Sequence, residues 1–152
     1  METYWRGLIA SGEFSWNPGG RSLEDYEKAY LQREFGPECS DAAGLYAELY
    51  QAVSFWNWAL CEKENRLRLE KVIDLPDLQS PGKWSEKYSQ RLKTAEKEIE
   101  RYPRLKAQLS DLLLKTRRNP YHLQLLSAIN DFQVSAPRLL LALRDCDTSD
   151  KE

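Results

Sequence analysis

The sequence predicts an all-α protein, a helical bundle whose second half contains long antiparallel helices. The strongest indication is a heptad stripe over residues 88–112, in which apolar side chains alternate steps of four and three. A second stripe spans residues 126–143, and the two are expected to pack antiparallel. Only one short run, residues 66–69, alternates like a strand, and a single run without a partner forms no sheet. The first stripe comprises Tyr88, Leu92, Ala95, Ile99, Tyr102, Leu105, Leu109 and Leu112, and the second Leu126, Ile129, Gln133, Ala136, Leu140 and Leu143.

Two shorter helices are expected at the start of the chain. Apolar and small residues recur at steps of three and four over residues 5–16, and the Asn-Pro-Gly-Gly sequence at 17–20 then ends this helix. Ser22 is a typical N-cap for a second helix, with Asp25 three residues later in a position like that of a capping box. The Gly-Pro pair at 36–37 is expected to close it.

A longer, aromatic helix is expected next, capped by Ser40 and Asp41 and continuing to about residue 60. Aromatic residues widen its stripe, so we expect it to contact neighbours on more than one side, with Trp56 and Trp58 packed in the core. Charges and prolines over residues 65–83 then predict a wrapping loop or crossover. The stripe comprises Ala42, Leu45, Leu49, Val53, Trp56 and Leu60, flanked by Tyr46, Tyr50, Phe55 and Trp58.

Three prolines mark the helices of the second half. Pro103 lies inside the first stripe and predicts either a kink or a new helix that begins there. Pro120 follows Asn119 and predicts the start of the last helix, which Pro137 is expected to bend. Residues 145–152 are nearly all polar and are expected to fray.

Composition restricts the classes of partner. The 152 residues predict a single core, and 22 basic against 24 acidic residues give a net charge of -2, which favours neither nucleic acid nor an anionic membrane surface. No apolar run approaches the length of a membrane helix, and the first residues lack the order of a signal peptide. We therefore expect a soluble protein, with the cytoplasm slightly favoured. The absence of paired cysteine spacings predicts three free thiols, at Cys39, Cys61 and Cys146.

The residues predict no catalytic site, no cofactor site and no metal site in this chain. The only histidine, His122, is expected to be structural or solvated, and the carboxylate pairs lie among lysines and arginines on outer helix faces. Residues 19–22 precede a helix but lack the length and lysine of a phosphate loop. The basic cluster of Lys115, Arg117 and Arg118 complements a helix end, which explains it without a ligand.

One segment resembles a known family. The run from Tyr4 to Pro18, which contains Gly12-Glu13-Phe14-Ser15-Trp16, resembles the last helix and exit of the (β/α)₈ barrel in family 20 glycoside hydrolases, the β-N-acetylhexosaminidases. In that family a Gly or Ala is followed by Glu, two residues and Trp. The segments Ser22-Leu23-Glu24-Asp25-Tyr26 and Arg33-Glu34-Phe35-Gly36 extend the match. A similar exit occurs in α-glucuronidases, so the resemblance indicates a superfamily of sugar hydrolases.

The resemblance implies a C-terminal helical domain or fragment of a hydrolase, structural and inactive by itself, because the family's catalytic pair lies on earlier barrel strands. It divides the chain into barrel-exit-like helices at residues 1–36 and a helical bundle at 37–152. It also implies that Trp5, Glu13 and Trp16 pack on the barrel or contact carbohydrate, and that the catalytic barrel is the partner.

Two alternatives remain open at this point. The first is an independent interaction module whose heptad stripes pair with another chain or with a second copy of this one. The second is a small enzyme that works alone, with a site that the sequence does not reveal.

Overall fold

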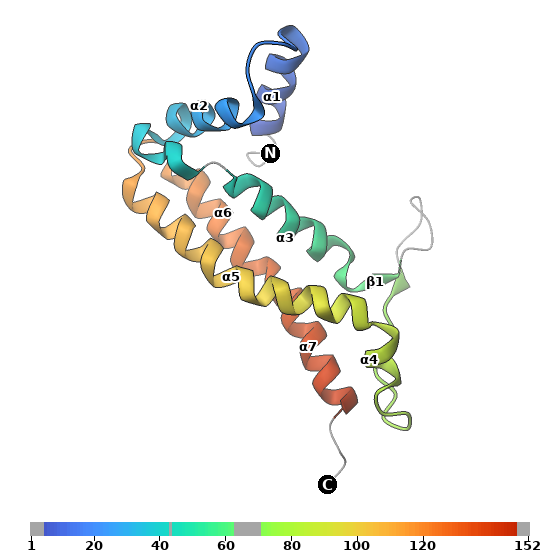
Figure 1. Ribbon diagram of the computed structural model, residues 1–152. Helices are drawn as coiled ribbons and strands as arrows, with labels where there is room; N and C mark the ends of the chain where they lie inside the picture. The colour runs from blue at the N-terminus through green and yellow to red at the C-terminus, as the bar shows by residue number, and fades with distance from the viewer. Residues whose placement is uncertain (1–4, 43, 63–70, 149–152) are drawn as a thin grey trace. The chain divides into compact units, whose positions relative to one another are not determined.

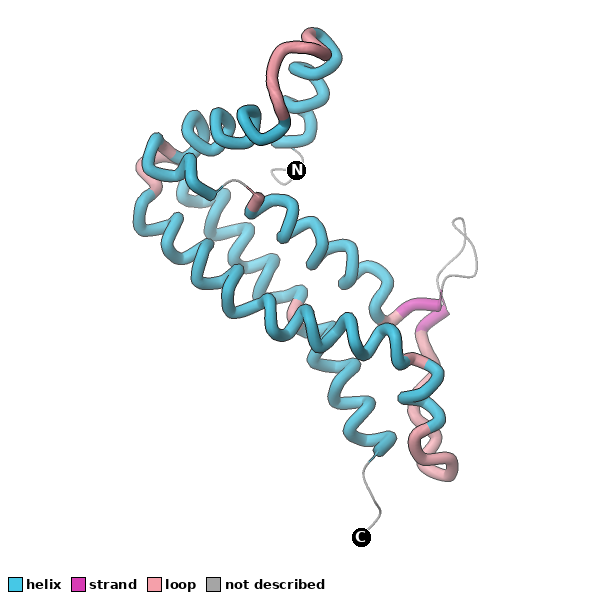
Figure 2. Tube along the Cα trace, in the orientation of Figure 1, coloured by secondary structure: helices cyan, strands magenta, loops and turns pink. Residues whose placement is uncertain are grey.

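The computed structural model describes residues 5–42, 44–62 and 71–148, and most of these residues lie in helices (Figures 1 and 2). The predicted all-α bundle is therefore confirmed. Contacts divide the chain into two compact units, which we call unit 1 (Met1–Glu48 and Leu105–Ile129) and unit 2 (Leu49–Arg104 and Asn130–Glu152). The boundary that the resemblance places between residues 36 and 37 falls within unit 1, and it stays a prediction.

The first two helices begin and end where the sequence predicts. Helix α1 (Trp5–Trp16) stops before the Asn-Pro-Gly-Gly turn, and α2 (Leu23–Phe35) follows it. The Ser22 hydroxyl oxygen accepts a hydrogen bond from the backbone N–H of Asp25 at 3.0 Å, which satisfies one of the free donors at the start of α2. Gly36 ends α2 with a φ of 121°, a backbone conformation that favours glycine.

The long helix predicted from Ser40 is wrong at its beginning. Residues 40 and 41 belong to a short 3-10 helix, η2 (Pro37–Ala42), and α3 (Leu45–Ala59) begins only after Gly44. Gly44 has a φ of 93°, so the backbone turns there and cannot continue as a right-handed helix.

The buried face of α3 also differs from the predicted stripe. Val53 is half-buried and Trp56 is exposed, whereas Phe55 lies in the core of unit 2. Leu45 and Leu49 are buried as predicted, and the stripe is wrong only after them. Because apolar residues occupy positions 52, 53, 55 and 56, the sequence allows two phases there, and the structure adopts the one that buries Ala52 and Phe55. Trp58 is half-buried against the core of unit 2, as expected. The buried residues of α3 are Leu45, Leu49, Ala52, Phe55 and Ala59.

A two-residue strand pairing follows α3. Strand β1 (Cys61–Glu62) pairs antiparallel with β2 (Lys71–Val72), a short pairing that the sequence did not predict. The alternating run at 66–69 lies outside the described residues. Residues 73–82 contain neither helix nor strand, as the predicted loop requires, and the short helix α4 (Lys83–Lys87) ends the segment.

Helix α5 (Ser89–Lys115) carries the heptad stripe and continues through Pro103, so no new helix begins there. Proline removes one backbone hydrogen bond, and this cost is tolerated because the stripe on either side is buried. The half before Pro103 buries the stripe in unit 2 and the half after it in unit 1. Tyr88, Leu92, Ala95, Leu105, Leu109 and Leu112 are buried, and Ile99 and Tyr102 are half-buried.

The last predicted helix is two helices, α6 (Pro120–Gln133) and α7 (Ser135–Thr148). Pro120 occupies the first position of α6, as predicted. The interruption falls at Val134, and not at Pro137, which occupies the first turn of α7 where proline needs no backbone partner. Of the second stripe, Gln133, Ala136 and Leu140 are buried, while Leu126, Ile129 and Leu143 are half-buried.

Fraying was predicted for the C-terminal residues, but α7 continues as far as Thr148. Residues 149–152 lie outside the described part. The side chain of Asp147 is only 3% exposed, and its Oδ2 accepts a hydrogen bond from the backbone N–H of Ser85 at 2.8 Å. Its carbonyl oxygen accepts a second bond from the N–H of Gly82 at 3.1 Å. Asp147 therefore caps the five-residue helix α4, whose own N-cap, Gly82, has no side chain.

The pKa of Asp147 is lowered as a result. Burial by itself would raise it, but hydrogen bonds from Ser85 and from the backbone of the first turn of α4 stabilise the carboxylate and outweigh this effect. Because the folded-state pKa of Asp147 lies below the ordinary value of about 3.9, its carboxylate stabilises the fold at pH values above about 3.9. This stabilisation is lost as the pH falls through the lowered pKa.

Asp147→Asn is therefore expected to lower the urea midpoint of unfolding at pH 7, with a difference from wild type that shrinks as the pH falls through the lowered pKa of Asp147. Asp145→Asn is the matched control, since Asp145 forms only an exposed ion pair with Arg144 at 2.9 Å. A midpoint for Asp147→Asn that equals the control at pH 7, or a difference that grows as the pH falls, would contradict the capping role.

Candidate functional site

Helix α1 presents an uncharged face to solvent. Its two charged residues, Arg6 and Glu13, both form ion pairs with residues outside α1, in unit 1. Leu8 is 61% exposed and Trp16 92% exposed, so large apolar side chains lie where charged ones are usual. We call the exposed set the α1 face; it comprises Gly7, Leu8, Ile9, Ser11, Gly12, Ser15 and Trp16.

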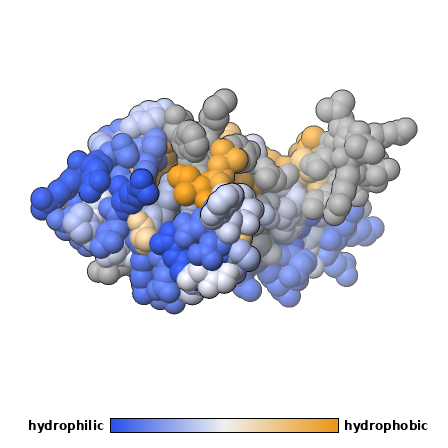
Figure 3. All heavy atoms as spheres, turned by 90° about the horizontal axis from the view of Figure 1, so that it is seen from above, coloured by the Kyte–Doolittle hydropathy of each residue, from blue (hydrophilic) through white to orange (hydrophobic). Residues whose placement is uncertain are grey.

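Gly7 and Gly12 have no side chains, so they leave open space on the α1 face. A methyl group added at Gly7 or at Gly12 would meet no other atom within 4 Å, so space beside both residues is open. Viewed from above, hydrophobic surface lies next to strongly hydrophilic surface (Figure 3). A small, uncharged helix surface of this kind permits a partner's backbone or side chains to approach closely.

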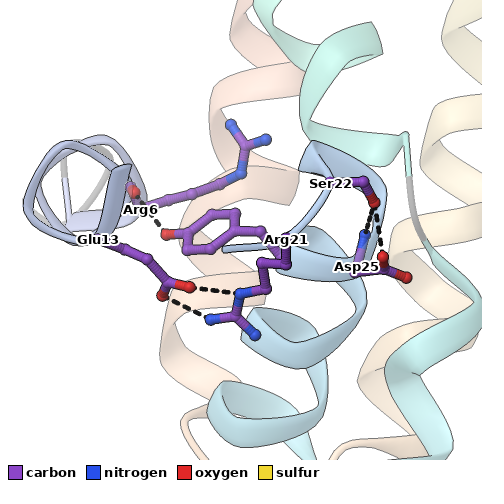
Figure 4. Close-up of polar contacts among 6 residues, drawn as sticks. Arg6, Glu13, Arg21, Ser22 and Asp25 are labelled. Carbon is purple, nitrogen blue, oxygen red and sulfur yellow. Dashed lines mark hydrogen bonds and ion pairs between the residues drawn. The ribbon is translucent and has the colours of Figure 1, made fainter. Parts of the chain in front are cut away.

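Arg6 attaches α1 to the rest of unit 1. Its guanidinium forms a close ion pair with Glu27 and lies 4.8 Å from the centre of the Tyr46 ring. Glu27 is only 9% exposed and also accepts a hydrogen bond from the backbone N–H of Gly44 at 3.2 Å. The Tyr26 hydroxyl donates to the carbonyl oxygen of Arg6 at 3.0 Å (Figure 4). Three segments, α1, α2 and the turn before α3, therefore meet at Glu27.

Three tyrosines pack beside this ion pair. The ring centres of Tyr26 and Tyr30 are 6.2 Å apart, and those of Tyr30 and Tyr46 are 5.9 Å apart in an edge-on arrangement. Burial raises the pKa of all three hydroxyls, most strongly that of Tyr46. They therefore stay protonated at neutral pH, and the cluster is suited to packing and hydrogen bonding, not to proton abstraction.

A cavity of about 430 Å³ lies between α1 and α2, and we call it the interhelical pocket. On one side Arg21 forms two parallel hydrogen bonds to Glu13, of which the Nη2–Oε2 bond measures 2.5 Å (Figure 4). This hydrogen bonding outweighs desolvation and lowers the pKa of Glu13. The pocket is lined by Ile9, Glu13, Arg21, Tyr26, Ala29, Tyr30, Arg33 and Glu34.

On the other side of the pocket Glu34 is engaged as well. Its Oε1 lies 2.7 Å from Nδ1 of His122 and accepts a hydrogen bond from Nδ2 of Asn119 at 3.0 Å. Asn119 also donates to the carbonyl oxygen of Glu34 at 3.2 Å. His122 thus has a structural role, tying α6 to α2 within unit 1.

The two carboxylates that line the pocket, Glu13 and Glu34, do not form an acid and base pair for hydrolysis. A glycosidase acid needs a raised pKa, whereas Arg21 lowers that of Glu13. Both carboxylates are held by neighbouring donors, so the geometry is that of a binding surface with fixed charges. Sequence reasoning missed Arg21, Arg33 and Glu34 as pocket residues, because only the turn at 17–20 brings α1 and α2 together.

The three residues that the resemblance selected lie in different surroundings in the structure. Trp5 begins α1, but its side chain lies outside the described part of the structure. Glu13 points to Arg21, and Trp16 is exposed on the α1 face. The structure brings Glu13 into the pocket and leaves Trp16 outside it. Whether these residues pack on a barrel or contact sugar stays a prediction.

The other candidates from the sequence have ordinary roles. Of the basic cluster, Lys115 pairs with Asp111 at 2.5 Å and Arg117 with Glu38 at 2.8 Å.

Over residues 5–42, 44–62 and 71–148, no group of three or more His, Cys, Asp and Glu residues is arranged to hold a metal ion. Within the same ranges, no helix is long and apolar enough to cross a membrane.

Comparisons with known proteins find no relative of this chain. No protein-family model, no curated protein and no solved structure matches this chain. The function therefore has to be argued from the α1 face and the interhelical pocket.

Glu27→Leu is expected to lower the free energy of unfolding by about 1–3 kcal/mol, because the half-buried Arg6 guanidinium loses its carboxylate. The double variant Arg6→Met, Glu27→Leu is expected to lose less than the single one, since no uncompensated charge remains. Urea denaturation measures both. Glu24→Leu on the same helix breaks only the exposed pair with Lys28 and should change stability by less than about 1 kcal/mol. Equal losses of unfolding free energy for Glu24→Leu and Glu27→Leu would disprove the role of Glu27 in holding α1 to unit 1.

Proposed function

We propose that this chain is a non-catalytic helical domain of a carbohydrate-active hydrolase and that it docks on the catalytic barrel of that hydrolase through the α1 face. The observation that supports this proposal is the orientation of α1, whose charged residues pair within unit 1 while the apolar Leu8, Ile9 and Trp16 are exposed to solvent. The hydrolase as partner rests on the resemblance of Gly12-Glu13-Phe14-Ser15-Trp16 to the last barrel helix of family 20 enzymes.

The energetics of the α1 face favour a protein partner. Fully burying a side chain such as Leu8 or Ile9 contributes about 1.5–3 kcal/mol each, and Trp16 offers a large ring to an interface core. No charged side chain of α1 would have to be desolvated on docking, because Arg6 and Glu13 are already paired within unit 1. Gly7, Ser11, Gly12 and Ser15 leave room for close approach. These features are those expected of a helix that packs on a barrel strand or a neighbouring helix.

The alternative is an interaction module that pairs through its heptad stripes. This alternative has less support, because the stripe of α5 is largely buried inside the two units and is not free to pair. Unit 2 leaves several large apolar side chains exposed, among them the aromatic pair Trp56 and Phe132, with ring centres 5.4 Å apart.

The test is binding to a purified family 20 barrel truncated before its last helix, measured by titration calorimetry. The wild-type chain is expected to bind, and Leu8→Glu to weaken binding at least tenfold, because a charge would be buried in the interface. Leu114→Glu, on α5, is the matched control, since Leu114 is also exposed and lies outside the α1 face. Neither variant should change the far-ultraviolet circular dichroism spectrum.

Three outcomes would overturn the proposal. One is no binding by the wild-type chain; another is equal loss for Leu8→Glu and Leu114→Glu. The third is hydrolysis of 4-nitrophenyl N-acetyl-β-glucosaminide by the chain alone, which would show a catalytic site that the proposal denies. Self-association that Leu8→Glu abolishes, without any binding to the barrel, would assign the α1 face to a second copy instead.

A further inference from the structure

We propose that the interhelical pocket binds a small organic acid, with one carboxylate carried on an apolar body. The pocket volume of about 430 Å³ lies within the usual range for small-molecule sites, roughly 300–1,000 Å³. This inference does not rest on docking through the α1 face, although Ile9 belongs both to that face and to the lining of the pocket.

The hydrogen-bond donors left unused in the pocket belong to two arginines. Both oxygens of Glu13 accept from Arg21, and Oε1 of Glu34 contacts His122 and Asn119. In contrast, Arg33 forms no ion pair or hydrogen bond with any described residue. An arginine presents up to five N–H donors in a planar fork, and its preferred partner is a carboxylate bound through two parallel bonds.

A second donor lies nearby. Arg21 uses Nε and Nη2 for Glu13, and no bond is formed by its Nη1, while the guanidinium lies 5.4 Å from the centre of the Tyr26 ring. The pocket therefore holds two guanidinium groups with free donors, that of Arg33 and the Nη1 of Arg21. An entering carboxylate finds N–H partners on both of them.

The remaining walls are apolar. Ile9 and Ala29 contribute aliphatic surface, and the rings of Tyr26 and Tyr30 contribute aromatic surface. The hydroxyl of Tyr26 is already used by the backbone of Arg6. A ligand body that matches these walls is apolar, so a carboxylate on an aromatic or aliphatic ring fits both parts of the site.

The probe is benzoate, and benzamide is its uncharged counterpart of the same shape. In a titration followed by two-dimensional NMR of the full chain in carboxylate-free buffer, benzoate is expected to shift the Ala29 and Ile9 methyl signals and the Arg33 Nε–H signal. Benzamide is expected to bind at least roughly tenfold more weakly, because it lacks the charge that pairs with guanidinium.

Two variants locate the site. Arg33→Gln removes the free guanidinium and is expected to weaken benzoate binding about tenfold or more without altering the weak binding of benzamide. Ala29→Phe fills the pocket and is expected to abolish both, with circular dichroism confirming that the fold is kept. Arg118→Gln, an exposed arginine outside the pocket, is the matched control and should bind benzoate as wild type does.

Several results would overturn this inference. One is the absence of shifts when the benzoate concentration is raised to roughly a 20-fold excess over the protein and then to roughly 50 mM. The others are equal affinities for benzoate and benzamide, and unchanged benzoate binding by Arg33→Gln. Shifts confined to residues outside the pocket would equally refute it. Loss of the α1 docking reaction in Leu8→Glu leaves these shifts intact, so failure of the two proposals can be told apart.

Discussion

The ion pair between Arg6 and Glu27 is the contact on which the N-terminal part of unit 1 depends. Helix α1 has 12 residues, a length that is marginal for an isolated helix in water, and Leu8, Ile9 and Trp16 are exposed to solvent. It is held by a few inward contacts, chiefly the ion pairs of Arg6 with Glu27 and of Glu13 with Arg21, and the ring contact between Phe14 and Tyr26 at 5.4 Å. Glu27 also binds the backbone of Gly44, so one carboxylate fixes both α1 and the turn that precedes α3.

This attachment through charges explains the two features to which we assign function. Because Arg6 and Glu13 turn inward, the outer side of α1 is left with small and apolar residues, which water solvates poorly. Arg21 and Glu13 bridge the two helices at one end, and Ile9, Ala29 and Tyr30 line the space beside them, so the interhelical pocket lies between α1 and α2. The α1 face and the pocket are thus consequences of the same unusual orientation of one helix.

Local signals in the sequence predicted the fold well, and long-range contacts explain what they missed. Ser22, Gly36 and Pro120 set helix ends through their own backbone chemistry, so those ends were predictable. The phase of α3 was not, since four apolar residues within five positions fit two faces. Asp147 caps a helix 62 residues away, and no spacing rule detects such a contact. A resemblance anticipated only Glu13 in the pocket and Trp16 on the α1 face; Arg33 lines the pocket because of how α1 folds back on α2.

The orientation of α1 is the central claim, and paramagnetic relaxation by a soluble nitroxide tests it most directly. If α1 lies as described, the nitroxide broadens the Leu8 methyl and Trp16 indole N–H signals strongly, as it does those of any exposed group. The methyl signals of Leu31 and Leu109, which are buried in unit 1, stay sharp under the same conditions. Protection of Leu8 and Trp16 equal to that of Leu31 would contradict the account, because the apolar side of α1 would then face the chain.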